Sequence, residues 1–258
     1  MSLLNKIVER KRSTIASLKP SVSTPTTARL PFAERLTGSD INIIGEIKPK
    51  SPSCGNLLDI ERLDQVLNVY EKHCSAISVL TDEEFFGGSF DLLARVAERV
   101  SLPILCKDFI ISARQIDAAK QSGASAVLLV AKIVTVKELG FLINRARQAG
   151  LAPVVEVNDA SEVKAIDRMA AEVVLINNRN LQTMDVNLDT TKELAELLSV
   201  SQIKISASGI KTRDDIEKLI PYTSNFLIGT SLMQSADPES LLFSLKSSRF
   251  KSLQGAMK

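Results

Sequence analysis

Histidine is almost missing from this chain of 258 residues, and its scarcity narrows the possible chemistry. The one histidine, His73, follows Tyr70 and Lys72 near the end of a segment with the apolar spacing of a helix. A Ser-His-Asp triad and a metal site built from several histidines are therefore not expected. Acid–base chemistry has to come mainly from lysine, glutamate or aspartate side chains.

Cysteines and long apolar runs are also scarce. Cys54, Cys74 and Cys106 form an odd set without the spacing of metal ligands, which indicates a reducing compartment. Cys54 and Cys106 are expected to be small fillers of the apolar interior. No apolar run approaches the length of a membrane span, which needs about 20 residues, and residues 1–6 do not resemble a signal peptide. We therefore expect a soluble protein located in the cytoplasm.

The chain lacks an excess of charge of one sign. Its 32 lysines and arginines nearly balance its 30 aspartates and glutamates, which leaves a net charge of +2. No long-range field favours nucleic acid or a membrane as a partner, so neither is expected. The short charged cluster at residues 9–12 is expected to be a solvated helix face.

What the chain does contain is a repeating pattern of apolar runs, spaced by roughly 20–35 residues, the length of a βα unit. Segments with helical spacing separate the runs, as at Leu63, Val66 and Tyr70. Eight such alternations predict an α/β fold, a single (β/α)8 TIM barrel with its helices outside the sheet. An open doubly wound sheet is the alternative, but no Gly-x-Gly-x-x-Gly follows the first run. The runs are 41–47, 76–80, 103–106, 126–131, 152–157, 173–176, 203–206 and 225–228.

The residues before the first run are expected to form an N-terminal helical extension. A helix is predicted over 3–18, followed by a Ser/Thr/Pro-rich linker over 20–27. Residues 1–40 would then pack on a barrel formed by residues 41–258. Such an extension is in a position to cap one end of the barrel.

Charged and polar residues follow the apolar runs at equivalent places, where burying an unpaired charge costs several kcal/mol. In a parallel barrel the C-terminal strand ends converge on one rim, so residues distant in sequence become neighbours. The repetition therefore predicts a functional site at that rim. The residues expected there are Glu46, Lys48, Lys107, Asp108, Lys132, Glu156, Asn177, Asn178, Arg179, Ser208, Gly209, Gly229, Thr230 and Ser231.

Two glycine-containing turns predict a phosphate site. Ser208-Gly209 follows the seventh run and Gly229-Thr230-Ser231 follows the eighth, and each is expected to lead into a helix. Turns at these two places present main-chain N–H groups to an anion, and Lys48 and Ser51 are able to reach across. A phosphorylated small molecule is the expected ligand, although tight turns without a ligand would have the same sequence.

Lys107 and Glu156 are the candidates for the general acid and the general base, unless they form a buried ion pair that only holds the rim together. Burial would lower the pKa of a lysine, while neighbouring carboxylates oppose that change. Phe109, two residues after Lys107, is either a plain core residue or an apolar wall for an aromatic substrate.

In this order, the motifs closely resemble the indole-3-glycerol phosphate synthase family, a family of phosphate-binding barrels in tryptophan biosynthesis. The similarity runs through most of the chain, and the Lys-Asp-Phe motif together with Ser-Pro-Ser is highly specific. The matching segments are Glu46-Ile47-Lys48-Pro49-Lys50-Ser51-Pro52-Ser53, Ile77-Ser78-Val79-Leu80-Thr81-Asp82, Leu105-Cys106-Lys107-Asp108-Phe109-Ile110, Val154-Val155-Glu156, Ile176-Asn177-Asn178-Arg179-Asn180-Leu181 and Phe226-Leu227-Ile228-Gly229-Thr230-Ser231-Leu232-Met233.

The resemblance implies a reaction without cofactor or metal, in which a carboxyphenylamino-deoxyribulose phosphate is cyclised, decarboxylated and dehydrated. It also implies a role for each site residue. Lys107 would be the general acid that activates the ketone, Glu156 the general base, and Glu46 and Lys48 would assist ring closure and dehydration. Other enzymes of the tryptophan pathway are the expected protein partners. By similarity, Ser51, Ser208, Gly209, Gly229 and Thr230 would surround the phosphate, Phe109 and Leu128 would face the anthranilate ring, and Asn177 and Arg179 would fix polar groups near it.

One residue departs from the family pattern. Strand 7 of the family usually ends in Glu-Ser-Gly, whereas this chain has Ala207-Ser208-Gly209. Two further hypotheses are open, and this difference motivates the first of them. The first is a catalytically weakened barrel that binds a phosphorylated ligand or regulates a partner enzyme. The second is another sugar-phosphate barrel, such as an isomerase or epimerase, which would need no aromatic wall.

Overall fold

The fold is a closed barrel of eight parallel strands in a computed structural model that describes residues 3–18, 31–38, 40–52 and 54–247. Each predicted apolar run is a strand, so the (β/α)8 barrel is confirmed and the doubly wound sheet is wrong. The linker expected over 20–27 lies outside the described residues. The barrel strands are β1 Asn42–Ile47, β4 Ala76–Leu80, β5 Ile104–Lys107, β6 Ala126–Val130, β7 Ala152–Val157, β8 Val173–Asn177, β9 Ile203–Ala207 and β10 Asn225–Ile228.

Each barrel strand pairs with the strand before and after it, and β1 closes the ring by pairing with β10 as well as with β4. Some strand ends differ from the predicted ones. β5 begins at Ile104, one residue later than predicted. β5, β8 and β9 each extend one residue further than expected, to Lys107, Asn177 and Ala207. The strands themselves therefore carry these three residues to the rim.

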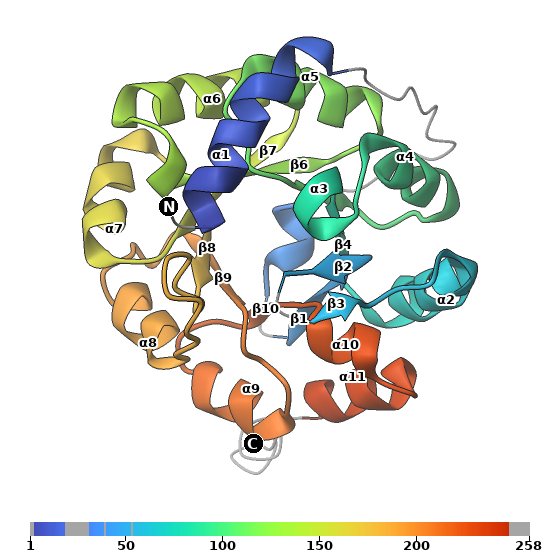
Figure 1. The fold of residues 1–258 in the computed structure, drawn as a ribbon. Coiled ribbons are helices and arrows are strands. Elements are labelled where there is room, and N and C mark those ends of the chain that lie inside the picture. Colours follow the sequence, from blue (N-terminus) through green and yellow to red (C-terminus); the bar gives the residue numbers. More distant parts are fainter. Residues whose placement is uncertain (1–2, 19–30, 39, 53, 248–258) are drawn as a thin grey trace.

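The helices form a ring around the barrel in chain order (Figure 1). The α-helices are α2 Leu63–His73, α3 Glu83–Phe86, α4 Phe90–Arg99, α5 Ala113–Gln121, α6 Val136–Gln148, α7 Ala160–Ile166, α8 Asp189–Ala195, α9 Arg213–Leu219, α10 Thr230–Gln234 and α11 Pro238–Lys246. Short 3-10 helices are η1 Ile15–Ser17, η2 Glu34–Leu36, η3 Ile60–Arg62, η4 Ala131–Ile133 and η5 Asp167–Met169. No helix in the described ranges is long and apolar enough to cross a membrane.

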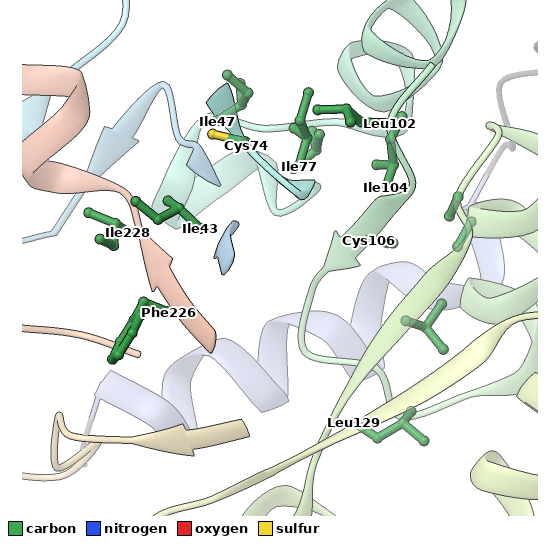
Figure 2. Close-up of a cluster of buried hydrophobic side chains, with 14 of the residues drawn as sticks. Ile43, Ile47, Cys74, Ile77, Leu102, Ile104, Cys106, Leu129, Phe226 and Ile228 are labelled. Atoms are coloured by element: carbon green, nitrogen blue, oxygen red, sulfur yellow. The ribbon is translucent and has the colours of Figure 1, made fainter. Parts of the chain in front are cut away.

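The core has two layers, because alternate residues of a strand point to opposite faces of the sheet. Ile43 and Ile47 of β1 pack outward against the helices, in the cluster shown in Figure 2. Ile44 points into the barrel and joins the inner cluster. Glu46 follows Ile44 by two residues and therefore also points inward, above the apolar filling. The inward positions nearest the C-terminal strand ends are where the barrel exposes polar groups to a ligand.

The N-terminal helix α1, Leu3–Thr14, lies across the open end of the barrel and continues into η1 (Figure 1). The predicted helix over 3–18 is therefore nearly right, with a last turn of 3-10 type. The solvated face expected for residues 9–12 is wrong for Lys11, whose side chain is 14% exposed. Its Nζ lies 3.0 Å from Asp82 Oδ2 and 2.6 Å from Asp108 Oδ1. Two loops of the barrel are thus joined through one lysine of α1.

A small hairpin after β1 was not expected from the sequence. Strands β2 Lys50–Ser51 and β3 Gly55–Asn56 pair in antiparallel fashion and place Ser51, which is buried, near the open end. Cys54, in the turn of the hairpin, is exposed, so its expected role as an apolar filler is wrong. Cys106 does fill the interior, and burial raises the pKa of its thiol to about 12.

Candidate active site

A cavity of about 940 Å³ opens at the C-terminal ends of the strands. Leu4 and Ile7 of α1 form part of its wall, so the N-terminal helix acts as a roof. Every residue to which the sequence assigned a role lines this one cavity. These are Glu46, Lys48, Ser51, Lys107, Phe109, Leu128, Glu156, Asn177, Arg179, Ser208, Gly209, Gly229 and Thr230.

The carboxylate of Glu46 connects the two lysines of the cavity. Its Oε1 lies 2.8 Å from Lys48 Nζ and its Oε2 lies 3.3 Å from Lys107 Nζ. Burial alone would raise the pKa of Glu46, but the two ammonium groups outweigh burial and lower the pKa to about 2. Glu46 is therefore ionised throughout the physiological range and acts as a fixed negative charge.

Lys107 lies between two carboxylates. Burial would lower the pKa of Lys107, and Arg179 acts in the same direction, but Glu46 and Glu156 outweigh both and raise the pKa above its ordinary value. The sequence left open whether burial or the carboxylates determine the pKa of Lys107, and in the structure the carboxylates have the larger effect. Lys107 carries a proton at neutral pH and is able to donate it to a ligand in the cavity.

Glu156 differs from Glu46 although both are buried acids at the same rim. Burial raises the pKa of Glu156, and the opposing effects of Lys107 and of the Asn177 hydrogen bond are smaller. Asn177 Nδ2 donates to Glu156 Oε1 over 2.9 Å, and Asn177 Oδ1 accepts from the main-chain N–H of Arg179 over 3.0 Å. A positioned carboxylate with a raised pKa suits a group that accepts and returns a proton.

The two glycine-containing turns lie at neighbouring strand ends. Ser208 and Gly209 have positive φ values of 71° and 82°. This turn leads into α9 as expected, after a short segment that ends at the helix start, Arg213. Gly229 does immediately precede α10. Lys48 Nζ donates to Thr230 Oγ1 over 3.0 Å and so reaches the second turn.

Gly229 has a second role beside the turn. A Cβ atom at this position would lie 2.2 Å from Glu46 Oε1. Only glycine therefore leaves the space that the Glu46 carboxylate occupies between Lys48 and Lys107.

Apolar side chains form the other part of the cavity wall. Leu128 is buried, and Phe109 faces Phe86 with ring centroids 6.2 Å apart and an angle of 31° between the rings. Sequence reasoning missed Phe86, Leu4, Ile7 and Met184, which also line the cavity. Each lies in a loop or helix whose approach to the rim depends on tertiary contacts, so no local pattern marks it.

Two of the polar residues expected at the rim lie outside the cavity. Lys132 Nζ contacts Asp159 Oδ2 at 3.5 Å and Glu162 Oε1 at 3.4 Å. Asn178, the residue after β8, is buried, and its side chain is hydrogen bonded to Ser206 and Thr191 outside the cavity. Within the described ranges, histidine, cysteine and acidic side chains form no group of three or more that would hold a metal ion.

Ala207 ends β9 and lines the cavity without contributing a polar group. Only 3% of this residue is exposed. A carboxylate at position 207, as in the family pattern, would therefore lie at the wall of the cavity.

Replacing Lys11 by methionine is expected to raise the KM for a ligand of this cavity about tenfold, with a smaller change in kcat. The change leaves Asp82 and Asp108 without their shared cation, so that only hydrogen bonds such as those from Phe85 N and Phe109 N compensate two buried charges, which is costly. Movement of α1 away from the rim lowers this cost but removes Leu4 and Ile7 from the cavity wall. Steady-state kinetics and hydrogen exchange of α1 measure both effects.

Lys6→Met is the control for Lys11→Met, because Lys6 is an exposed lysine of the same helix. It should change neither KM nor exchange in α1. If Lys11→Met leaves α1 as protected as in the parent protein, then the lysine does not hold the roof in place.

Comparison with known proteins agrees with the fold and with the motifs. A family model described as indole-3-glycerol phosphate synthase matches residues 4–245. The indole-3-glycerol phosphate synthase of Exiguobacterium sibiricum is 40% identical over 243 residues, which cover 92% of this chain and 94% of that protein. The enzyme of the same description from Streptococcus pneumoniae is 36% identical over 235 residues, which cover 90% and 92%.

Among solved structures, 3-hexulose-6-phosphate synthase from Salmonella typhimurium has the same fold. The TM-score is 0.67 at 12% sequence identity, with 81% of this chain and 99% of that chain covered. At this identity the similarity concerns the barrel alone. The match of the family model over almost the whole chain, together with the two relatives, shows that this chain belongs to the indole-3-glycerol phosphate synthase family.

Proposed function

We propose that this protein is a carboxy-lyase that converts 1-(2-carboxyphenylamino)-1-deoxyribulose 5-phosphate to indole-3-glycerol phosphate. The reaction closes a ring, releases carbon dioxide and then releases water, and it belongs to tryptophan biosynthesis. The observation that carries the proposal is the position of Lys107, which lines the same cavity as Glu156 and lies 3.3 Å from Glu46. Family membership supports the same reaction.

Lys107 is the general acid in this proposal, and Glu156 is the general base. A ketone becomes a better electrophile when a cationic donor reaches its oxygen, and the raised pKa keeps Lys107 protonated for this step. Dehydration requires a base that removes a proton from the CH2 carbon beside the nitrogen while the neighbouring hydroxyl leaves as water, and the raised pKa of Glu156 brings its basicity nearer to that needed at neutral pH. At the start of the proposed reaction Lys107 is protonated and Glu156 is ionised.

Glu46 and Lys48 assist ring closure and dehydration. With a pKa of about 2, Glu46 is a poor proton donor, so its contribution is to hold both ammonium groups in place and to stabilise positive charge. Lys48 lies between Glu46 and Thr230, and it therefore joins the reacting centre to the phosphate end of the cavity.

The substrate would bind with its phosphate at the two glycine turns and its anthranilate ring at the apolar wall. Arg179 is suited to the anthranilate carboxylate because its planar guanidinium matches two oxygens. Phe109 and Leu128 would face the ring. The phosphate would be surrounded by Ser51, Ser208, Gly209, Gly229 and Thr230.

Steady-state turnover of the purified protein with this substrate tests the proposal. Indole absorbance should appear with release of carbon dioxide, and a tryptophan auxotroph that lacks this step should grow when it carries the gene. Tight binding of the substrate without indole formation would instead support the weakened, regulatory barrel. The location in the cytoplasm and an interaction with other tryptophan-pathway enzymes stay predictions.

Restoring an acid in Ala207→Glu is expected to raise kcat by about 10–100-fold, the lower part of the range for one acid–base group. The new carboxylate would face the cavity and add a group able to exchange protons with the lysines. Phosphate affinity should stay the same, since Ser208 and Gly209 are unchanged. Pre-steady-state and steady-state kinetics of the variant provide the measurement.

Ala207→Gln is the matched control for Ala207→Glu, because it adds the same volume without the charge. An equal gain in both variants, or a kcat that does not rise in Ala207→Glu, would show that the missing carboxylate does not limit turnover.

A further inference from the structure

Asn178 is a buried amide outside the cavity, and every polar atom of its side chain has a partner. It is 2% exposed. Its Nδ2 donates to Ser206 Oγ and to the main-chain oxygen of Ser208, both over 3.0 Å. Its Oδ1 accepts from Thr191 Oγ1 over 2.7 Å and from Thr191 N over 3.2 Å. A side chain satisfied in this way has one fixed orientation.

The partners of Asn178 connect three parts of the chain. Thr191 Oγ1 and Ser206 Oγ are also hydrogen bonded to each other over 2.7 Å, and both residues are fully buried. The main-chain N–H of Asn178 donates to Ala207 O over 2.9 Å. Helix α8, the end of β8 and the end of β9 are therefore locked together directly behind the Ser208-Gly209 turn.

This turn has a conformation that requires support. Ser208 has a φ of 71°, a left-handed conformation that costs a non-glycine residue roughly 1 kcal/mol or more. Gly209 follows with a φ of 82°, and a Cβ atom on it would lie 2.4 Å from Val186 Cγ1. The hydrogen bond from Asn178 to the Ser208 carbonyl is the contact that holds this peptide group from behind.

The direction of one main-chain N–H group follows from this hydrogen bond. In a planar trans peptide the C=O of one residue and the N–H of the next point in opposite directions. Asn178 holds the Ser208 C=O on the side of the barrel wall. The N–H of Gly209 therefore points the other way, toward the cavity that Gly209 lines.

We propose that Asn178 is a positioning residue that fixes the Ser208-Gly209 peptide so that the Gly209 N–H is aimed at the phosphate group of the substrate. This inference rests on the proposed function, which places the phosphate at this turn. Asn178 itself does not touch the ligand. Its side-chain hydrogen bonds reach the Ser208 carbonyl but neither Lys107 nor Glu156, so its loss should affect the phosphate end of the cavity most.

Asn178→Ser removes the donor to the Ser208 carbonyl and tests the inference. Calorimetric titration should show that the Kd for inorganic phosphate rises about tenfold, since a hydrogen bond to a charged group is lost or misdirected. The Kd for N-methylanthranilate, which has the aromatic acid but no phosphate, should stay the same. In steady-state kinetics KM should rise with little change in kcat.

Asn225→Ser is the matched control. Asn225 is also a buried asparagine, it also donates to a main-chain carbonyl, that of Lys204, over 3.0 Å, and it lies at the opposite end of the barrel. It should lower the melting temperature without changing the Kd of either probe. Thr191→Val is a milder second variant, which removes the hydroxyl that holds Asn178 Oδ1 and should raise the phosphate Kd about threefold.

The outcomes separate this inference from the proposed function. If the parent protein does not bind inorganic phosphate in the cavity, the phosphate site and this inference both fail. Unchanged phosphate affinity in Asn178→Ser and Thr191→Val, with normal binding in the parent, overturns only the role of Asn178. Equal weakening of phosphate and N-methylanthranilate also overturns it, because that result indicates a general structural role.

Discussion

Replacing Lys107 by methionine is expected to lower kcat by about 10³- to 10⁴-fold, the upper part of the range for a positioned acid. Methionine has a side chain of similar length and removes the ammonium group, so no proton donor and no positive charge remain at this position. Without this ammonium group, Glu46 and Glu156 lose the cation that both of them face. Indole absorbance during single turnover measures the chemical step, and substrate binding is expected to weaken much less than kcat.

Lys132→Met is the control for Lys107→Met, because it makes the same change at the end of the next strand. Lys132 pairs with Asp159 and Glu162 outside the cavity, so its loss should leave kcat within about twofold of the parent value. Comparable losses in the two variants would mean that general stability, and not proton donation, explains the effect of Lys107.

Glu46→Gln is expected to lower kcat by about 10²- to 10³-fold. Glu46 holds Lys48 at 2.8 Å and Lys107 at 3.3 Å, and glutamine keeps the shape but not the charge. The two ammonium groups would then repel each other without a carboxylate between them. Since Ala207 supplies no second carboxylate from β9, the site has little to compensate for this loss.

The same variant should also change the pH dependence of the rate. The proposed mechanism needs Glu156 ionised and Lys107 protonated, so the rate falls below the pKa of Glu156 and above the pKa of Lys107. The charge of Glu46 raises both pKa values. Its removal should therefore shift both limbs of the pH profile of kcat/KM to lower pH.

Glu162→Gln serves as control for this shift, because Glu162 is a buried glutamate with a raised pKa that lies beside Lys132 outside the cavity. Its pH profile should match that of the parent. Limbs that stay in place in Glu46→Gln would disprove the electrostatic coupling of Glu46 to the acid and the base.

The barrel was predictable because its strands are buried on both faces and read as continuous apolar runs. The interruption of such a run by Glu46 or Glu156 was visible for the same reason. In a closed parallel sheet the strand order alone fixes which ends meet, so distant residues could be placed on one rim without knowledge of any contact. The strand order was therefore sufficient to predict that the candidate site residues lie together.

The roof and the aromatic partner could not be predicted from the sequence. Lys11 lies between the exposed Arg10 and Arg12 in a run of charged residues, and only the approach of α1 to Asp82 and Asp108 makes it different. Phe86 lies in a helix of one turn whose orientation depends on tertiary contacts. The pKa of Lys107 is a balance of opposing effects, and its sign depends on distances that no sequence pattern contains.

The position of α1 limits how the gene product can be joined to other polypeptides. Leu3 and Leu4 line the cavity, so a tag or a fused enzyme joined to the chain before α1 would be tethered close to the cavity. A bulky N-terminal fusion would hinder access to the barrel or pull the roof aside. A short flexible spacer, rich in glycine and serine, would keep such a fusion partner away from the opening.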